Sequence, residues 1–174
     1  METENSRQVT VKCLARPIHP TPPESIKVRA ATLFNYAALA LIAGALLHVV
    51  GLLMGPEAVK FLGAPPDVVQ SIADKTLYGP TLTLAIAALL GGLAVLSLKA
   101  KKTRNKIIRA ILWLFAFIFT LRGLLIFLFV PAIMAGRNGG DAKLFWFHVG
   151  ASFFVLTIGI ALGWALLKTR KAVS

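Results

Sequence analysis

The stretch AATLFNYAALALIAGALLHVVGLLMGP (residues 30–56) decides the fold, because it contains no Asp, Glu, Lys or Arg over its whole length. The hydrocarbon core of a bilayer is about 30 Å thick, so about 20 apolar residues cross it as a helix. Lipid offers a peptide group no hydrogen-bond partner, and a helix bonds its own peptide groups. We therefore predict that residues 30–54 form a membrane-spanning helix.

Three further stretches are long and apolar enough to span a bilayer, at residues 77–98, 110–134 and 144–167. The whole chain of 174 residues is 57% hydrophobic and 15% charged, whereas soluble domains are about 45–50% apolar and about 25% charged. Short connections make successive helices antiparallel. The sequence thus predicts an all-α polytopic membrane protein, with a four-transmembrane-helix antiparallel bundle over residues 30–167.

The basic residues predict the orientation of these spans. Of the 19 Lys and Arg side chains, 14 lie in residues 1–29, 99–109 and 168–174, and four lie in the loops at 55–76 and 136–143. Short loops rich in Lys and Arg stay in the cytoplasm. We expect a multi-pass protein of the cell inner (plasma) membrane, with both termini cytoplasmic (N-in, C-in) and anionic lipids at its cytoplasmic face.

The net charge of +12 is thereby explained as a topology signal, and we expect no nucleic-acid partner. Residues 1–29 contain the proline-rich segment RPIHPTPPES. Because proline at this density opposes a helix, we predict a flexible cytoplasmic tail. Residues 168–174 form a second, basic cytoplasmic tail.

The loop GPEAVKFLGAPPDVVQSIADKT (residues 55–76) is the most structured-looking segment outside the predicted spans. We expect GPEAVK to form a turn and a short helix to begin at Pro66, because proline suits a first helical turn. Val68, Val69 and Ile72 would share one face of that helix. It would lie on the outer leaflet as an interfacial helix or, alternatively, form a lid over a pocket.

Small residues four apart predict where the spans approach one another closely, as in small-xxx-small packing. Three such pairs occur: Ala40 and Gly44, Ala88 and Gly92, and Gly159 and Gly163. The third span instead carries five phenylalanines, which would supply bulk against the smoother helices. These motifs serve an intramolecular bundle and a homo-oligomer equally well, and both remain open.

Arg122 is the only Arg or Lys inside a predicted span. A central arginine costs about 2.5–3.5 kcal/mol on insertion scales, so an intramembrane arginine is by default a functional hypothesis. No predicted span contains Asp or Glu. The partner of Arg122 is left open among a backbone carbonyl, an anionic or carbonyl-bearing ligand, and a polar side chain. The candidate side chains within the spans are those of Asn35, Tyr36, Tyr78, Thr81 and Thr83. If Arg122 reached outward, it would meet Glu57 or Asp141. For a ligand site we choose Arg122, Tyr78 and Asn35.

His48 and His148 are the other ionisable residues of the predicted spans. At about 1.5 Å per residue they lie about 9 Å and about 11 Å outward of their helix centres, hence at similar depth. Facing each other, they would hold the iron of a haem b through two axial imidazoles. A histidine bonded to a carbonyl or to water is the alternative. We expect haem only in this alternative function and no cofactor otherwise.

Three segments carry a family resemblance: GPEAVKFLGAPPDVV (residues 55–69), TLYGPTLTLAIAALL (residues 76–90) and LRGLL (residues 121–125). With them the chain resembles small four-helix bacterial inner-membrane proteins of unknown function and is distantly similar to the DoxX-like group. The resemblance covers roughly residues 30–167. It implies the four-span topology and no activity, and it marks Arg122 and the first outer loop as family-like features.

The sequence shows no Ser-His-Asp arrangement and no His/Cys/Asp/Glu cluster with zinc spacing, so we expect neither enzymatic activity nor a metal site. Our first hypothesis is an accessory or interaction subunit of a larger membrane complex, or a binder of a small lipid-like molecule in an outward pocket near Arg122. The alternatives are a haem b electron carrier using His48 and His148, and an oligomeric small transporter.

Overall fold

The structure, a computed structural model, describes the backbone of residues 24–103, 105–135 and 142–171 and the side chains of residues 28–103, 105–125 and 145–169. The described chain forms six helices and no strand. The helices are α1 (Glu24–Met54), α2 (Pro56–Phe61), α3 (Pro66–Ala73), α4 (Tyr78–Ala100), α5 (Lys106–Ala135) and α6 (Ala142–Lys171). Four of them, α1, α4, α5 and α6, are long and apolar enough to cross a membrane. The predicted all-α architecture with four spans is confirmed.

The helices extend beyond the predicted spans. The helix α1 begins at Glu24, directly after Pro23, and α6 continues to Lys171. The predicted boundary at residue 30 was therefore wrong: it followed the apolar stretch, whereas helical hydrogen bonds continue into the polar residues that flank it. The rest of the predicted tail, residues 1–23, lies outside the described residues.

The prediction of a turn at GPEAVK was also wrong. Residues 56–61 form the helix α2, and Gly55 is its N-cap. Pro56 occupies the first turn of α2, where its missing N–H costs no hydrogen bond. Glu57 lies in the same turn and Lys60 in the last one, and both charges complement the helix dipole. The predicted helix at Pro66 is confirmed as α3.

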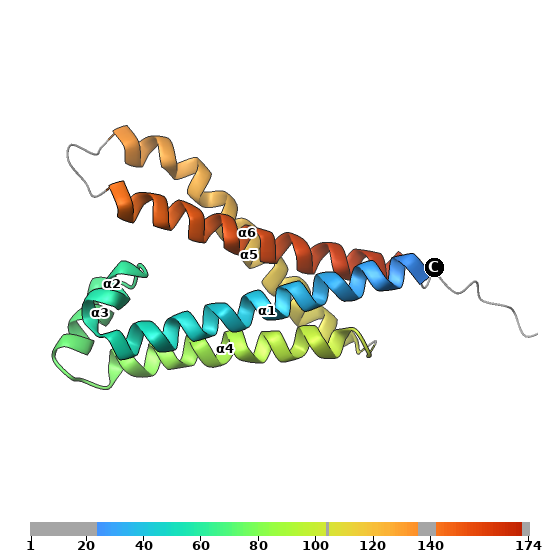
Figure 1. Ribbon diagram of the computed structural model, residues 1–174, viewed down its shortest axis with the longest axis horizontal. Coiled ribbons are helices and arrows are strands. Elements are labelled where there is room, and N and C mark those ends of the chain that lie inside the picture. The colour runs from blue at the N-terminus through green and yellow to red at the C-terminus, as the bar shows by residue number, and fades with distance from the viewer. Residues whose placement is uncertain (1–23, 104, 136–141, 172–174) are drawn as a thin grey trace, which may run out of the picture.

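The four long helices form two antiparallel pairs, α1 with α4 and α5 with α6 (Figure 1). Contacts between α1 and α6 join the two pairs. In Figure 1 the pairs lie close together at the end that holds the start of α1 and the end of α6, which we call the terminal end. They diverge toward the end that holds α2 and α3, which we call the loop end.

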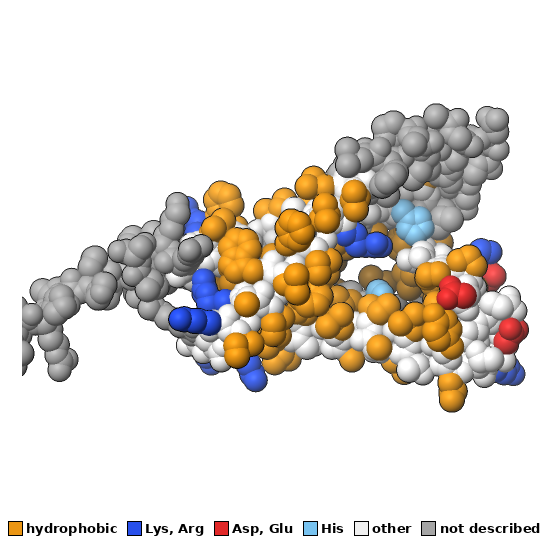
Figure 2. Space-filling view, turned by 180° about the vertical axis from the view of Figure 1, so that it is seen from behind, with side chains coloured by type: hydrophobic (Ala, Val, Ile, Leu, Met, Phe, Trp, Pro, Cys, Tyr) orange, Lys and Arg blue, Asp and Glu red, His pale blue; other side chains and the backbone are white. Residues whose placement is uncertain are grey.

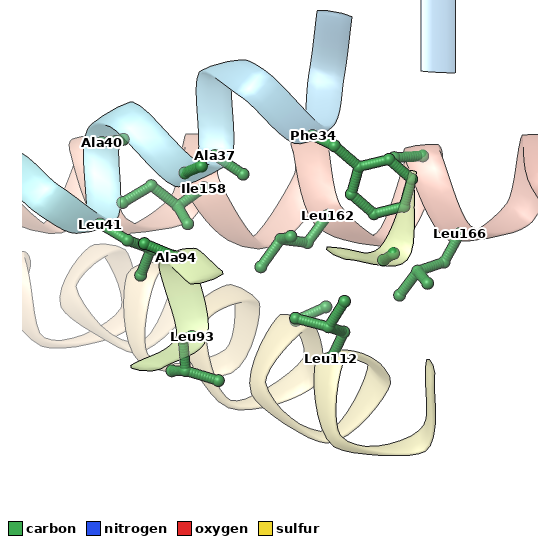
Figure 3. Close-up of a cluster of buried hydrophobic side chains, with 14 residues drawn as sticks. Phe34, Ala37, Ala40, Leu41, Leu93, Ala94, Leu112, Ile158, Leu162 and Leu166 are labelled. Atoms are coloured by element: carbon green, nitrogen blue, oxygen red, sulfur yellow. The ribbon is translucent and has the colours of Figure 1, made fainter. Parts of the chain in front are cut away.

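The hydrophobic core lies in the half of the bundle near the terminal end. Side chains from all four long helices meet there (Figure 3): Phe34, Ala37 and Leu41 of α1, Leu93 and Ala94 of α4, Leu112 of α5, and Ile158, Leu162 and Leu166 of α6. The hydroxyl of Ser97 is fully buried in the same region and donates to the carbonyl of Leu93 at 2.8 Å. Polar groups in this core are therefore satisfied within their own helix.

Two glycines bring the backbones of α5 and α6 into contact. A Cβ added to Gly159 would lie 2.5 Å from Thr120 Oγ1 and 2.6 Å from Thr120 N. A Cβ added to Gly123 would lie 2.6 Å from Leu156 Cβ. The predicted role of Gly159 as a close-packing residue is confirmed, and Gly123 has the same role without having been predicted.

The small-residue pair of α4 is not used for close packing within the described part of the chain. A Cβ added to Gly92 would meet no atom within 4 Å in the described part of the chain. Gly92 therefore makes no close helix contact there. The reason is that four-residue spacing identifies a smooth face but does not say whether another helix covers it. On α1, Gly44 makes an ordinary contact, at 3.4 Å from a built Cβ to Leu90 Cδ1.

We predict that Gly159→Ala lowers the free energy of unfolding by about 1–3 kcal/mol, because the new methyl group must push α5 and α6 apart. Gly92→Ala is the matched control, with the same chemical change on a span helix that has open space. Alanine is favoured over glycine in helices, so this variant keeps or slightly raises stability. Unfolding in mixed detergent, followed by circular dichroism, measures both. Equal stability of the two variants would contradict the α5–α6 contact.

Candidate functional site

One stripe of side chains on α4 changes from buried to exposed along the helix. Leu82, Ile86, Leu89 and Leu93 follow one another at steps of four, three and four residues, so they share a face. Leu93 is 2% exposed in the core, whereas Leu82, Ile86 and Leu89 are 38%, 38% and 49% exposed. This face of α4 is thus packed near the terminal end and uncovered toward the loop end.

A stripe on α5 shows the same change. Leu112 is fully buried, and Phe115 and Phe119 are partly buried against the core. Arg122 continues this face, at three residues beyond Phe119, and is exposed. The two stripes therefore border a wedge-shaped space between the diverging helix pairs, which we call the hollow. Figure 2 shows it as a dark opening with histidine side chains and a Lys or Arg side chain at its edge.

Arg122 lies near the middle of a membrane-spanning helix. The helix α5 runs over Lys106–Ala135, so Arg122 is within about 3 Å of its midpoint at 1.5 Å per residue. No hydrogen bond or ion pair joins its guanidinium to another residue in the described part of the chain. The five N–H donors of the guanidinium thus remain open to a bound group.

Most of the side chains considered as partners of Arg122 bond elsewhere. Tyr36 shares a hydrogen bond of 2.7 Å with Thr157 of α6. Thr83 donates to the carbonyl of Gly79. Glu57 pairs with Lys60 at 3.7 Å. The side chain of Thr81, on α4, makes no hydrogen bond to the described residues. Asp141 lies outside the described residues.

The three residues predicted as a ligand site do not form one cluster. Asn35 accepts a hydrogen bond from Lys101, just beyond the end of α4. Tyr78, the first residue of α4, donates to Asp67 Oδ2 at 3.2 Å. Because about 23 residues of helix separate these two contacts, they lie about 35 Å apart. Of the three residues, only Arg122 lies at the hollow. The sequence does not show which helices pair, so it could not separate Arg122 from Asn35 and Tyr78.

The two histidines both lie toward the loop end. His48 Nδ1 is 3.0 Å from the carbonyl oxygen of Gly44, and because a carbonyl only accepts, Nδ1 carries the hydrogen. The ring of His148 lies edge-on to Phe147, with centroids 5.7 Å apart. His148 Cε1 is 2.8 Å from a Cβ built on Gly63. A haem ligated by these two histidines stays a prediction. In such a complex, His48 would bind the iron through Nε2, because its Nδ1 is hydrogen-bonded to Gly44.

Residues 61–63, at the end of α2 and directly after it, connect α1 with α6 through three contacts, which together we call the loop bridge. The Phe61 and Phe147 rings have centroids 4.4 Å apart. Leu62 Cδ1 packs against Gly51 of α1, and Gly63 packs against His148 of α6. Gly63 has φ +89°, a conformation that only glycine adopts readily. The bridge lies at the loop end of the hollow, between α1 and α6.

The helix α3 is anchored to the start of α4. Val68 and Ser71 are 3% and 8% exposed. Ser71 Oγ accepts a hydrogen bond from the Gly79 backbone N–H at 2.7 Å. A Cβ on Gly79 would lie 2.6 Å from the Val68 carbonyl oxygen. The predicted apolar face thus packs against α4, and the buried polar contact of Ser71 had no signal in the apolar spacing.

A scan against protein-family models, a search of curated proteins and a search of solved structures each find no match to this chain. The similarity to the DoxX-like group therefore stays a prediction, and the geometry of the hollow is the guide to function.

We predict that Gly63→Ala opens the loop bridge, since the added methyl group would collide with the His148 ring and would strain a positive-φ backbone. Gly55→Ala is the matched control: Gly55 has φ +97° but open space around a built Cβ. Both variants are made with Phe61→Cys, Phe147→Cys and Cys13→Ser. The yield of thiol cross-linking between positions 61 and 147 should fall by about tenfold only in Gly63→Ala, if the collision costs about 1.4 kcal/mol. An equal yield in both variants would contradict the contact.

Proposed function

We propose that this protein is a multi-pass protein of the plasma membrane that binds a small lipid-like molecule in the hollow. The anionic or carbonyl-bearing head of this molecule contacts Arg122, and its chain lies along the apolar stripe of α4. The observation that carries the proposal is the guanidinium of Arg122, which lies at the wall of an apolar hollow without a partner among the described residues.

The energetics of an intramembrane arginine support this proposal. A central arginine costs about 2.5–3.5 kcal/mol to insert, and a carbonyl clamp within the protein would have repaid part of that cost. The described structure contains no such clamp, whereas Arg109 of the same helix does donate to the carbonyl of Leu166 at 2.9 Å. A bound anion would supply charge-assisted hydrogen bonds, which contribute about 1.5–3 kcal/mol each.

The distribution of charge supports the orientation with both termini in the cytoplasm. At the loop end, the acidic residues Glu57, Asp67 and Asp74 accompany Lys60 and Lys75. At the terminal end, seven basic residues outnumber the one acidic residue of the described helices, Glu24 at the start of α1: Arg29, Lys99, Lys101, Lys102, Lys106, Arg109 and Lys168. Figure 2 shows the acidic side chains gathered at one end of the molecule. The hollow would then open toward the outer half of the bilayer.

We predict that Arg122→Leu lowers the affinity for an anionic lipid by about tenfold to a hundredfold, corresponding to about 1.5–3 kcal/mol of lost charge-assisted bonding. Native mass spectrometry of protein titrated with oleate, and separately with phosphatidylglycerol, measures the bound fraction. The two ligands distinguish a carboxylate head from a phosphodiester head. Arg122→Lys should bind at intermediate strength because it keeps the charge but loses the planar donor set.

Lys106→Leu is the control for this experiment, because it removes one positive charge from the same helix at its exposed first turn. It should bind both lipids as the unmodified protein does. Circular dichroism establishes that each variant is folded. Unchanged binding in folded Arg122→Leu would refute the proposed site and leave Arg122 with a structural role.

We also predict that the loop end faces the exterior of the cell. In a Cys13→Ser background, Gln70→Cys in α3 should react with a membrane-impermeant maleimide in intact cells. Lys102→Cys, between α4 and α5, should react only after the cells are made permeable. Both positions are exposed, so access to the reagent is the only difference. The reverse pattern would overturn the orientation.

A further inference from the structure

We propose that the ligand enters the hollow from within the bilayer, through the gap between α4 and α5. The ligand is therefore a membrane-resident amphiphile, a molecule with a fatty-acid-like chain and an anionic head, and not a solute taken from water. This inference rests on the proposed function, because it concerns the route to the same Arg122 site.

The loop end offers the alternative route, and the loop bridge crosses it between α1 and α6. Phe61 stacks on Phe147 with ring centroids 4.4 Å apart, and Gly63 packs against His148. The bridge segment is also held from its other side, where α3 packs on α4 through the buried Ser71 and Gly79. A molecule from the aqueous side would have to break these apolar contacts.

The seam between α1 and α6 offers a lateral route, and helix contacts and a hydrogen bond cross it. These two helices contact each other through the core. Beside the core, the Tyr36 hydroxyl and Thr157 Oγ1 are hydrogen-bonded at 2.7 Å across the seam. Thr157 also donates to the carbonyl of Phe154 at 2.7 Å, so Tyr36 must be the donor to Thr157. Both hydroxyls are thus engaged and hold the two helices together.

The seam between α4 and α5 remains. Within the described residues, α4 and α5 contact each other much less than α1 and α4, α5 and α6, or α1 and α6 do. Both helices contribute to the core, through Leu93 of α4 and Leu112 of α5. Beyond it, Leu82, Ile86 and Leu89 are exposed on α4 and Arg122 is exposed on α5. An acyl chain that slides along this apolar stripe reaches the guanidinium without leaving the hydrocarbon.

The route determines the class of ligand. An apolar passage inside a bilayer gives no hydration to a polar solute, whose transfer from water would cost several kcal/mol per unpaired group. A lipid chain pays no such cost there, because it exchanges one apolar environment for another. The guanidinium of Arg122 beside the passage then selects, among lipids, those with a negative head.

The experiment uses a photoactivatable fatty acid, with a diazirine in its chain, added to phosphatidylcholine vesicles that contain the protein. The protein carries Cys13→Ser, Phe61→Cys and Phe147→Cys, and a short bismaleimide locks the loop bridge. Photolabelling of peptides that contain residues 82–89 and 122 is followed by mass spectrometry. We expect the locked and unlocked proteins to be labelled at rates within about twofold of each other.

A matched pair of variants tests the passage itself. Leu89→Trp narrows the gap between α4 and α5 and should reduce labelling near Arg122 by about tenfold. Leu84→Trp is the control, because Leu84 has the same exposure of 49% but lies about 140° around the helix from Leu89. It should leave labelling unchanged. Equal labelling of the two variants would overturn the α4–α5 route.

The outcomes separate the inference from the proposed function. Loss of labelling in the locked protein, with labelling that depends on Arg122 in the unlocked one, overturns the lateral route and preserves the site. Labelling of the unlocked protein that is the same in Arg122→Leu overturns the site and the route together. Labelling that survives the lock, needs Arg122 and is blocked by Leu89→Trp supports both.

Discussion

The packing of the core at one end of the bundle is the constraint on which the rest of the structure depends. In lipid there is no hydrophobic force between helices, so they associate where surfaces fit closely. In this chain the close fit lies near the terminal end, where Phe34, Leu112 and Leu162 are fully buried, and along α5 and α6 at Gly123 and Gly159. The two helix pairs are joined there and diverge beyond it, so the hollow follows from where the core ends.

The hollow in turn leaves the guanidinium of Arg122 accessible to a ligand. An arginine that packs against carbonyls is structural, and Arg109 illustrates that role by donating to Leu166 O. Arg122 continues the face of Phe115 and Phe119 past the edge of the core, into space between the pairs. Its helix tolerates the charge because each surrounding Leu, Ile, Phe or Val favours insertion by about 0.3–0.6 kcal/mol. The same side chain one turn earlier would have disrupted the core.

The sequence predicted the four spans, their antiparallel order and the helix at Pro66, because bilayer thickness and proline chemistry act locally. It also singled out Arg122 from its charge alone. It did not separate Asn35 and Tyr78 from Arg122, because their bonds to Lys101 and Asp67 depend on which helices pair. For the same reason it assigned Gly92 to a helix contact and overlooked Gly123. Which helices pair is determined by the assembled bundle, and the spacing of residues along one helix does not show it.

The division into two pairs has a consequence for how the protein is made. Each pair consists of spans that are consecutive in the chain, so α1 and α4 form a hairpin by local contacts while later residues are still being synthesised. Phe34 and Leu41, however, complete their surroundings only with Ile158 and Leu162 of the last span. Until α6 is synthesised, the hairpin of α1 and α4 must persist in the bilayer with the α6-facing side of α1 uncovered. Chains truncated before α6 should therefore be recognised by quality control as unfinished, although α1 and α4 are already paired.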